Sequence, residues 1–357
     1  MIATRVVFVV VAYAAAWIFA SSMQMPREGF FQIWHRWDAI HYLAIAEHGY
    51  EGPGTVGHVT VFWPLFPLLV RGLSAVGLSG VVAGMLISAV ASVVAAAFLY
   101  ELAEMDAGEG AGRRAVLYLL VFPTAVFLIA PYAEALFLAG AVPAFLLARR
   151  RRWLPAGAAA AVAVAARPVG LFLVVGLAVE FVMARDVSRK SLVRGSLALA
   201  IALAPLVAYL GYLWAIEGSP LAFLTDQRVG WLREFTDPLS ALTTTVGFVT
   251  DQQLDPNFRL AYAGEILAVV AGIGFTVWAF NERRWGYGAF MATTLLPFLF
   301  STFYLSVPRV LLSLFPIVVL LASWTRRREL AHETLVVIMA PLAALGVITF
   351  TRFLWFF

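Results

Sequence analysis

The chain has 357 residues, of which 62% are hydrophobic and 13% are charged. An ordinary soluble domain carries about 25% charged residues, so the composition excludes that class and predicts a membrane protein. The net charge of +4 is modest and the sequence has no basic run typical of nucleic-acid binding, so no nucleic-acid partner is expected. The lack of cysteine excludes disulfides and thiolate metal sites.

Apolar segments recur from one end of the chain to the other, many of them near the roughly 20 residues that a membrane helix needs. In the hydrocarbon core every backbone polar group must be satisfied internally, and the segments do not alternate as barrel strands do, so they are expected to be helices. We predict an all-α polytopic integral membrane protein with about eleven transmembrane helices. In chain order the predicted spans are 4–22, 80–103, 114–130, 131–148, 153–167, 168–184, 195–216, 260–280, 285–304, 306–324 and 333–353.

The first apolar segment begins with Arg5 and is also compatible with a cleaved signal peptide. An uncleaved first helix is favoured because many spans follow. A further apolar segment, 59–77, is interrupted by Pro64, Pro67 and Arg71. We expect it to lie at the membrane surface without crossing, the alternative being a twelfth span.

With 59–77 at the surface, 16 of the 25 basic residues fall on one side of the membrane. The positive-inside rule makes that side cytoplasmic and places the N-terminus there. If 59–77 crossed, Arg5 would lie opposite the other clusters. The basic residues on this side are Arg5, Arg113, Arg114, Arg149 to Arg152, Arg185, Arg189, Lys190, Arg194, Arg283, Arg284 and Arg326 to Arg328.

This topology gives a single transmembrane domain over 1–357 with two long outer segments, 23–79 and 217–258. Several spans, such as 114–130 and 153–167, are shorter than the hydrocarbon core, which is about 30 Å thick. Their outer turns should therefore lie at the floor of an outward-open recess. The ionisable and tyrosine residues at these turns are Tyr132, Glu134, Arg167 and Arg309. Such residues at membrane depth are functional candidates, although they also snorkel or pair with one another.

The stretch HRWDAIHYLAIAEHGY (35–50) concentrates ionisable and aromatic residues in the first outer segment. A helix over 37–49, ended by Gly49, would place Asp38, His41, Ile45 and His48 on one side, with Tyr42 beside them and Glu47 opposite. Three interpretations stay open. Asp38 is a general base for a hydroxyl proton, Asp38 with His41 and His48 binds a divalent metal, or the polar residues solvate an interfacial helix whose aromatics include Trp34 and Trp37.

The same stretch, followed by VFWPLFPLLVR, resembles the first outer loop of the PIG-V-like mannosyltransferases, which are the GPI second-mannose enzymes and their bacterial relatives. Further stretches resemble later elements of that family: FPTAVFLIAPYAEALF (122–137), AARPVGL (165–171) and VPRVLLSLFPIVVLL (307–321). The motifs occur in the family's order. The chain departs from the family at Pro168, often a polar residue, and at Ala133, often a serine. Segment 217–258 shows no such resemblance.

The resemblance implies a GT-C-like bundle with a catalytic first outer loop. It also implies transfer of mannose from a polyprenyl-phosphate-mannose donor to an acceptor hydroxyl on the non-cytoplasmic side. Asp38 is then the general base of an inverting reaction. Arg167 and Arg309 are the first candidates to bind the leaving phosphate, and Arg36 and Arg259 are the second candidates. Arg259 equally suits an interfacial anchor. The other candidates for contact with the substrate, or for bracing an arginine, are His41, His48, Tyr132 and Glu134.

Other functions compete with this interpretation. One is a GT-C transferase with another acceptor, such as protein hydroxyls. Another is a secondary transporter with Asp38, Glu134 and the arginines along a solute path, although the sequence shows no internal repeat of the kind that transporters often have. No cofactor is expected, and a divalent metal stays open.

The sequence also bears on location and acceptor. Lys190 is the only lysine among the 25 basic residues, which indicates a GC-rich genome and favours a bacterium. We therefore expect a bacterial cytoplasmic membrane protein, in contact with membrane lipids, whose acceptor is a glycolipid such as a phosphatidylinositol mannoside.

Overall fold

The computed structural model describes residues 2–18, 29–52, 55, 57–185 and 188–354. The end of the predicted span 4–22 and part of the predicted outer segment 23–79 lie outside these ranges. Within them the regular structure is helical, and one isolated β-bridge joins Phe235 to Ser301.

The helices follow one another with short connections. In chain order they are α1 (Ile2–Ile18), η1 (Gln32–Trp34), α2 (Asp38–His48), α3 (Leu65–Ser74), α4 (Gly80–Ala107), α5 (Ala111–Leu120), η2 (Ala125–Leu128), α6 (Glu134–Arg149), α7 (Trp153–Ala166), α8 (Val169–Met183), α9 (Arg189–Glu217), α10 (Ala222–Trp231), α11 (Pro238–Thr250), α12 (Pro256–Asn281), α13 (Trp285–Leu299), α14 (Val307–Ser313), α15 (Pro316–Thr325) and α16 (Glu329–Thr351). The two η elements are 3₁₀ helices, and the others are α-helices.

Four of the described helices, α4, α9, α12 and α16, are long and apolar enough to cross a membrane. The helices α14 and α15 together form a fifth candidate, bent by 72° between them. This confirms the all-helical membrane class. At least one helix overlaps each of the eleven predicted spans, but several of these helices are short, so the count of eleven spans is not confirmed. At 1.5 Å per residue, the 15 residues of α8 extend about 23 Å, less than the hydrocarbon core of about 30 Å.

The predicted span 114–130 is helical only as far as Leu120 and continues as η2 and an irregular turn. Helix α4 compensates for the lost helical hydrogen bonds. Ser92 Oγ donates to the Leu128 carbonyl at 2.9 Å, and Ser88 Oγ donates to the Ala130 carbonyl at 2.8 Å. Irregular backbone inside a membrane protein is tolerated where protein groups satisfy it in this way.

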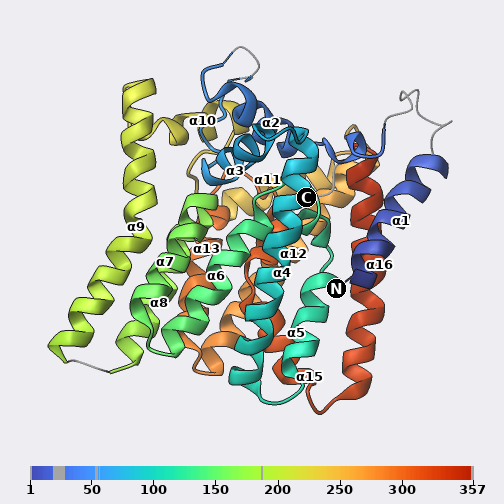
Figure 1. Ribbon diagram of the computed structural model, residues 1–357. Helices are drawn as coiled ribbons and strands as arrows, with labels where there is room; N and C mark the ends of the chain where they lie inside the picture. The colour runs from blue at the N-terminus through green and yellow to red at the C-terminus, as the bar shows by residue number, and fades with distance from the viewer. Residues whose placement is uncertain (1, 19–28, 53–54, 56, 186–187, 355–357) are drawn as a thin grey trace.

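The helices form a bundle with a cap of shorter helices at one end (Figure 1). Helices α2, α3 and α10 gather at this end, which we call the α2 end, and the arginine-rich connections after α6, α12 and α15 lie at the opposite end (Figure 1). Helix α3, within the predicted surface segment 59–77, has 10 residues and extends about 15 Å, too short to cross. Which end faces the cytoplasm stays a prediction.

Helix α7 packs closely between α6 and α9 through small residues, as is common at helix contacts in membranes. A Cβ atom added to Gly140 of α6 would lie 2.6 Å from the Ala163 nitrogen and 2.7 Å from the Ala159 oxygen of α7. A Cβ on Gly157 of α7 would collide with the Ala198 carbonyl oxygen of α9. These contacts fix the position of α7, at whose end Arg167 lies.

The substitution Gly140→Ala should therefore destabilise the protein by about 1–3 kcal/mol, because the methyl group meets backbone atoms that cannot turn away. Thermal unfolding of the purified protein in detergent measures this. The matched control is Gly211→Ala in α9, where nothing lies within 4 Å of the added Cβ, and it should be neutral or slightly stabilising. Equal stability of the two variants would show that α6 and α7 do not need this close approach.

Candidate active site

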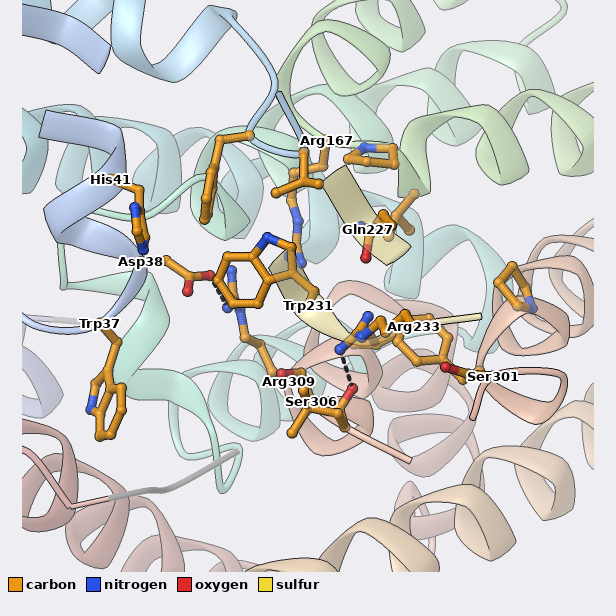
Figure 2. Close-up of a pocket in the computed structure, with 18 of the residues that line it drawn as sticks. Trp37, Asp38, His41, Arg167, Gln227, Trp231, Arg233, Ser301, Ser306 and Arg309 are labelled. Atoms are coloured by element: carbon orange, nitrogen blue, oxygen red, sulfur yellow. Dashed lines mark hydrogen bonds and ion pairs between the residues drawn. The ribbon is translucent and has the colours of Figure 1, made fainter. Parts of the chain in front are cut away.

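A cavity of about 750 Å³ lies at the α2 end of the bundle. Its walls come from α2, from α10 and the segment after it, from the α7–α8 turn and from the segments around α13 and α14. The charged residues in the lining are Asp38, Arg167, Arg233, Glu234 and Arg309. Figure 2 shows Asp38 joined to Arg309 at one side of the cavity, with Arg167 nearby.

Four of the predicted site residues form one ion-pair network. Arg309 pairs through Nη1 with Asp38 Oδ2 and through Nε with Glu134 Oε1. Arg167 Nη1 lies 2.8 Å from the same Glu134 oxygen and donates to Ser313 Oγ at 3.0 Å. Glu134 is completely buried. Two carboxylates thus balance two guanidinium groups, and their mutual attraction and hydrogen bonds offset the cost of removing these charges from water.

The backbone before each partner of the Asp38–Arg309 pair has an uncommon conformation. Trp37, directly before Asp38, has φ +53°, and Ser306, three residues before Arg309, has φ +64°. Residues other than glycine seldom adopt positive φ, and such positions persist only where their surroundings hold them. The Glu265 carboxylate of α12 holds Ser306 and the start of α14 in place, because it accepts hydrogen bonds from the N–H groups of Ser306 at 2.6 Å and Val307 at 2.7 Å.

Tyr132 holds the start of α2. Its hydroxyl accepts a hydrogen bond from the Asp38 N–H at 3.0 Å and donates one to the Arg36 carbonyl at 3.1 Å. Its ring centroid lies 4.9 Å from the Arg309 guanidinium, which also lies 5.1 Å from the ring centroid of Phe127. The two rings place a cation–π surface beside Arg309. Tyr132 therefore positions both members of the Asp38–Arg309 pair.

Asp38 keeps one oxygen available to the cavity. Arg309 occupies Oδ2, whereas Oδ1 has no hydrogen-bond partner among the residues that the structure describes. His41 lies one turn further along α2 and also lines the cavity, with its ring stacked 5.0 Å from the Phe62 ring. Burial lowers the pKa of His41 below 6.5, partly opposed by the charge of Asp38. Burial therefore favours the neutral imidazole, which can donate one hydrogen bond and accept another.

Five of the predicted site residues line this cavity: Asp38, His41, Tyr132, Arg167 and Arg309. Glu134 is not part of the lining, but it bonds both network arginines from behind. The structure therefore brings six of the predicted residues into one site.

The other three predicted residues lie elsewhere. Arg36 is turned toward Phe353, with its guanidinium 5.3 Å from that ring. Arg259 donates to the Val249 carbonyl at 3.0 Å and to Gln252 Oε1 at 3.3 Å, and so joins the end of α11 to the start of α12. His48 lies at the far end of α2, 3.8 Å from the Glu47 carboxylate.

Helix α2 ends at Gly49, which has φ +81°, as predicted. Arg71 caps this end by donating to the Ala46 carbonyl at 2.7 Å and the Glu47 carbonyl at 3.2 Å. His48 is ten residues from Asp38 along the helix, a rise of about 15 Å, so Asp38, His41 and His48 do not converge on one point. The described residues contain no group of three or more histidines and carboxylates placed to hold a metal ion.

The structure adds site residues that the sequence did not indicate. The segment 217–258 folds into α10 and α11, and Gln227, Trp231 and Arg233 from it line the cavity. Asp226 fastens α10 to the first outer segment, since its carboxylate accepts hydrogen bonds from the Thr60 N–H at 3.0 Å and the Thr60 hydroxyl at 2.6 Å. The dense mixture of charged and aromatic residues over 225–235 was the available signal for this wall.

The fold and the site together define an integral membrane protein of the helical-bundle class, with a buried carboxylate–arginine site at one end. Residues 12–183, just under half of the chain, match the family model described as Mannosyltransferase (PIG-V), so this part of the chain is similar to that family. This match confirms the resemblance found in the sequence, and it supports a membrane mannosyltransferase, hence a glycosyltransferase. No curated protein and no solved structure is significantly similar to the chain.

Removal of the Glu134 charge should reveal how strongly the network is coupled. Glu134→Gln leaves Arg167 without a carboxylate and should destabilise the protein by about 3–5 kcal/mol. Arg167→Gln should also destabilise it, and the double variant should lose clearly less than the sum of the two, because the groups form one unit. Unfolding in detergent measures all three variants.

The matched control is Glu101→Gln, which breaks the exposed 2.8 Å pair with Arg150. Its effect should stay below about 1 kcal/mol, as for other surface pairs. Additive losses at Glu134 and Arg167 would contradict the coupled network.

Proposed function

We propose that the protein transfers mannose from a polyprenyl-phosphate-mannose donor to a hydroxyl group of a membrane glycolipid, on the extracytoplasmic face of a bacterial cytoplasmic membrane. The observation that carries the proposal is the placement of Asp38. One of its oxygens is held by Arg309, and the other is open to a cavity that two further arginines line. This is the arrangement that a general base needs opposite a phosphate leaving group.

In the proposed reaction the acceptor hydroxyl oxygen attacks the anomeric carbon of mannose. The hydroxyl proton passes to Asp38 Oδ1, and the bond between the anomeric carbon and the phosphate oxygen breaks. The transition state has oxocarbenium character, as in glycosidases that invert configuration. A β-linked donor would then give an α-mannoside and free polyprenyl phosphate.

Arg167 and Arg309 are the proposed partners of the leaving phosphate. Both line the cavity, and guanidinium groups match phosphate oxygens with paired, charge-assisted hydrogen bonds. Glu134 fixes their orientation from behind, so little reorganisation is needed when charge develops on the phosphate. Neutral His41 is placed to hydrogen-bond a sugar hydroxyl.

The nature of the donor follows from the proposed orientation. Nucleotide sugars are cytoplasmic, so an outward-facing site needs a sugar carried by a lipid. The site lies at the end of the bundle opposite the arginine-rich connections, which the positive-inside rule assigns to the cytoplasm together with the N-terminus. A phosphatidylinositol mannoside is a suitable acceptor, and an acceptor hydroxyl on a protein is the alternative for the same chemistry.

The test is mannosyl transfer by purified protein, in detergent, from labelled polyprenyl-phosphate mannose to a lipid extract. Asp38→Asn should lower the rate by about 10²–10⁴, because the amide cannot accept the hydroxyl proton. Glu47→Gln is the matched control, since this carboxylate lies on the same helix with its side chain 76% exposed, and it should leave the rate unchanged. Both variants must remain monodisperse.

Each outcome has a clear meaning. Equal transfer by wild type and Asp38→Asn would remove Asp38 as the base and direct the search to Glu134. A labelled protein product in place of a lipid would favour the protein acceptor. Failure of the wild type to transfer would reject the donor, and uptake by sealed vesicles would then test the secondary transporter.

We also propose that the reaction needs no metal ion, because the arginines can stabilise the phosphate charge themselves. The transfer rate should change less than about twofold in excess EDTA, a loss too small to be the several kcal/mol that a Lewis-acidic ion contributes. A large loss that Mg²⁺ or Mn²⁺ restores would contradict this proposal.

A further inference from the structure

Arg233 differs from the other two arginines of the cavity. It lies in the segment between α10 and α11 and lines the cavity. Its Nη2 atom donates to the Leu305 carbonyl at 2.8 Å, and its guanidinium lies 5.6 Å from the ring centroid of Phe298. Its Nε atom is buried and has no hydrogen-bond partner among the residues that the structure describes. This side chain is therefore held in place but has unused donor capacity.

No carboxylate of the described residues pairs with Arg233, whereas Arg309 pairs with two and Arg167 with one. Glu234 also lines the cavity but forms no ion pair with its neighbour, and the Glu265 carboxylate is already bonded to two backbone N–H groups. Burial lowers the pKa of Arg233, and the charges of Glu265 and Asp38 only partly oppose this. A partly buried cation that bonds a carbonyl but has no carboxylate partner favours an anionic ligand.

Ser301 provides a second unused group in the same cavity. It is 7% exposed, and within the described part of the chain its Oγ atom has no hydrogen-bond partner. Figure 2 shows Ser301 and Arg233 on the same side of the cavity, away from His41. Buried donors in native proteins are almost always satisfied, so two unsatisfied donors at one wall indicate the place of a ligand with acceptor oxygens.

The wall that carries these two residues is rigidly built. The Thr236 N–H donates to the Phe300 carbonyl at 2.8 Å, and the Glu234 N–H donates to Thr302 Oγ1 at 2.9 Å. The β-bridge between Phe235 and Ser301 lies between these bonds. A preorganised donor pair binds an anion without first losing conformational entropy.

The wall is also close to the proposed reaction centre and to apolar surface. Both Asp38 and Arg309 act electrostatically on Arg233. Phe235, which is 85% exposed, stacks on Phe300 at 5.3 Å, and both rings line the same cavity. An anion bound here would have the Asp38–Arg309 pair on one side and exposed aromatic surface, suited to a lipid chain, on the other.

We propose that Arg233, assisted by Ser301, binds the phosphate group of the polyprenyl phosphate moiety, and so selects a donor that carries an anionic lipid phosphate. This inference rests on the proposed function. The charges agree with it, since the network of Asp38, Glu134, Arg167 and Arg309 is neutral, and Arg233 supplies a further positive charge opposite the phosphodiester. Glu234, the other charged residue of the lining, is exposed to solvent. Arg233 anchors the ground state, whereas the network arginines meet the charge that develops during transfer.

The test uses polyprenyl phosphate without sugar, titrated onto the purified protein in detergent and followed by isothermal calorimetry. Arg233→Gln should raise the Kd by about 10- to 100-fold, the effect of losing a charged hydrogen-bonding partner. Arg233→Lys should recover part of the affinity, since it keeps the charge but not the planar fork. Ser301→Ala should weaken binding by about five- to tenfold. Arg228→Gln, on the exposed side of α10, is the matched control and should bind as wild type does.

The same variants are then compared in the transfer assay, where Arg233→Gln should raise KM for the donor more than it lowers kcat.

Unchanged Kd in both Arg233→Gln and Ser301→Ala would overturn the inference, as would absence of polyprenyl phosphate binding by wild type. If wild type binds polyprenyl phosphate through Arg233 but transfers no mannose, the proposed function fails while the phosphate site stands. If wild type transfers mannose and Arg233→Gln leaves Kd and KM unchanged, only the phosphate site fails.

Discussion

The rest of the site depends on the double ion pair of Glu134. A carboxylate with no exposed surface inside a membrane bundle is tolerable only because two guanidinium groups reach the same oxygen from α14 and from the end of α7. Those arginines come from segments more than 100 residues apart, so the pairing also fixes how the halves of the bundle meet. Arg309 then extends the network to Asp38 on α2. The buried charge of Glu134 thus positions Arg309, which in turn holds the candidate base Asp38 beside the cavity.

The same constraint acts on the backbone. A bundle of short helices exposes many helix ends at membrane depth, and each end needs partners for its polar groups. Ser88 and Ser92 satisfy the irregular segment before α6, Tyr132 satisfies the start of α2, and Glu265 satisfies the start of α14. Because these side chains satisfy the polar groups at the helix ends, the helices can end before they meet one another. The space that this leaves at the α2 end is the cavity.

The sequence was sufficient for features that depend on composition and local spacing. The arginine clusters marked one end of the bundle, and the i, i+3 spacing of Asp38 and His41 placed both at the cavity. It was insufficient where tertiary contacts decide. His48 continues the same periodic face but lies beyond the cavity, and the helix expected over 114–130 stops at Leu120. Arg233 is held at the cavity by the pairing of 234–236 with 300–302 and by its bond to the Leu305 carbonyl. No local sequence pattern indicates a contact between segments so far apart in the chain.

The proposed chemistry is consistent with the way in which the site distributes charge. Before reaction the four-residue network is neutral, and a phosphodiester opposite Arg233 forms a second neutral set. When the glycosidic bond breaks, the phosphate becomes a monoester and gains negative charge, while Asp38 takes up the acceptor proton and leaves the network positive. The two changes occur on groups that share one cavity of low polarity, where interactions between charges are strong. Proton acceptance by Asp38 would therefore make Arg309 available to the leaving group at the moment when its charge appears.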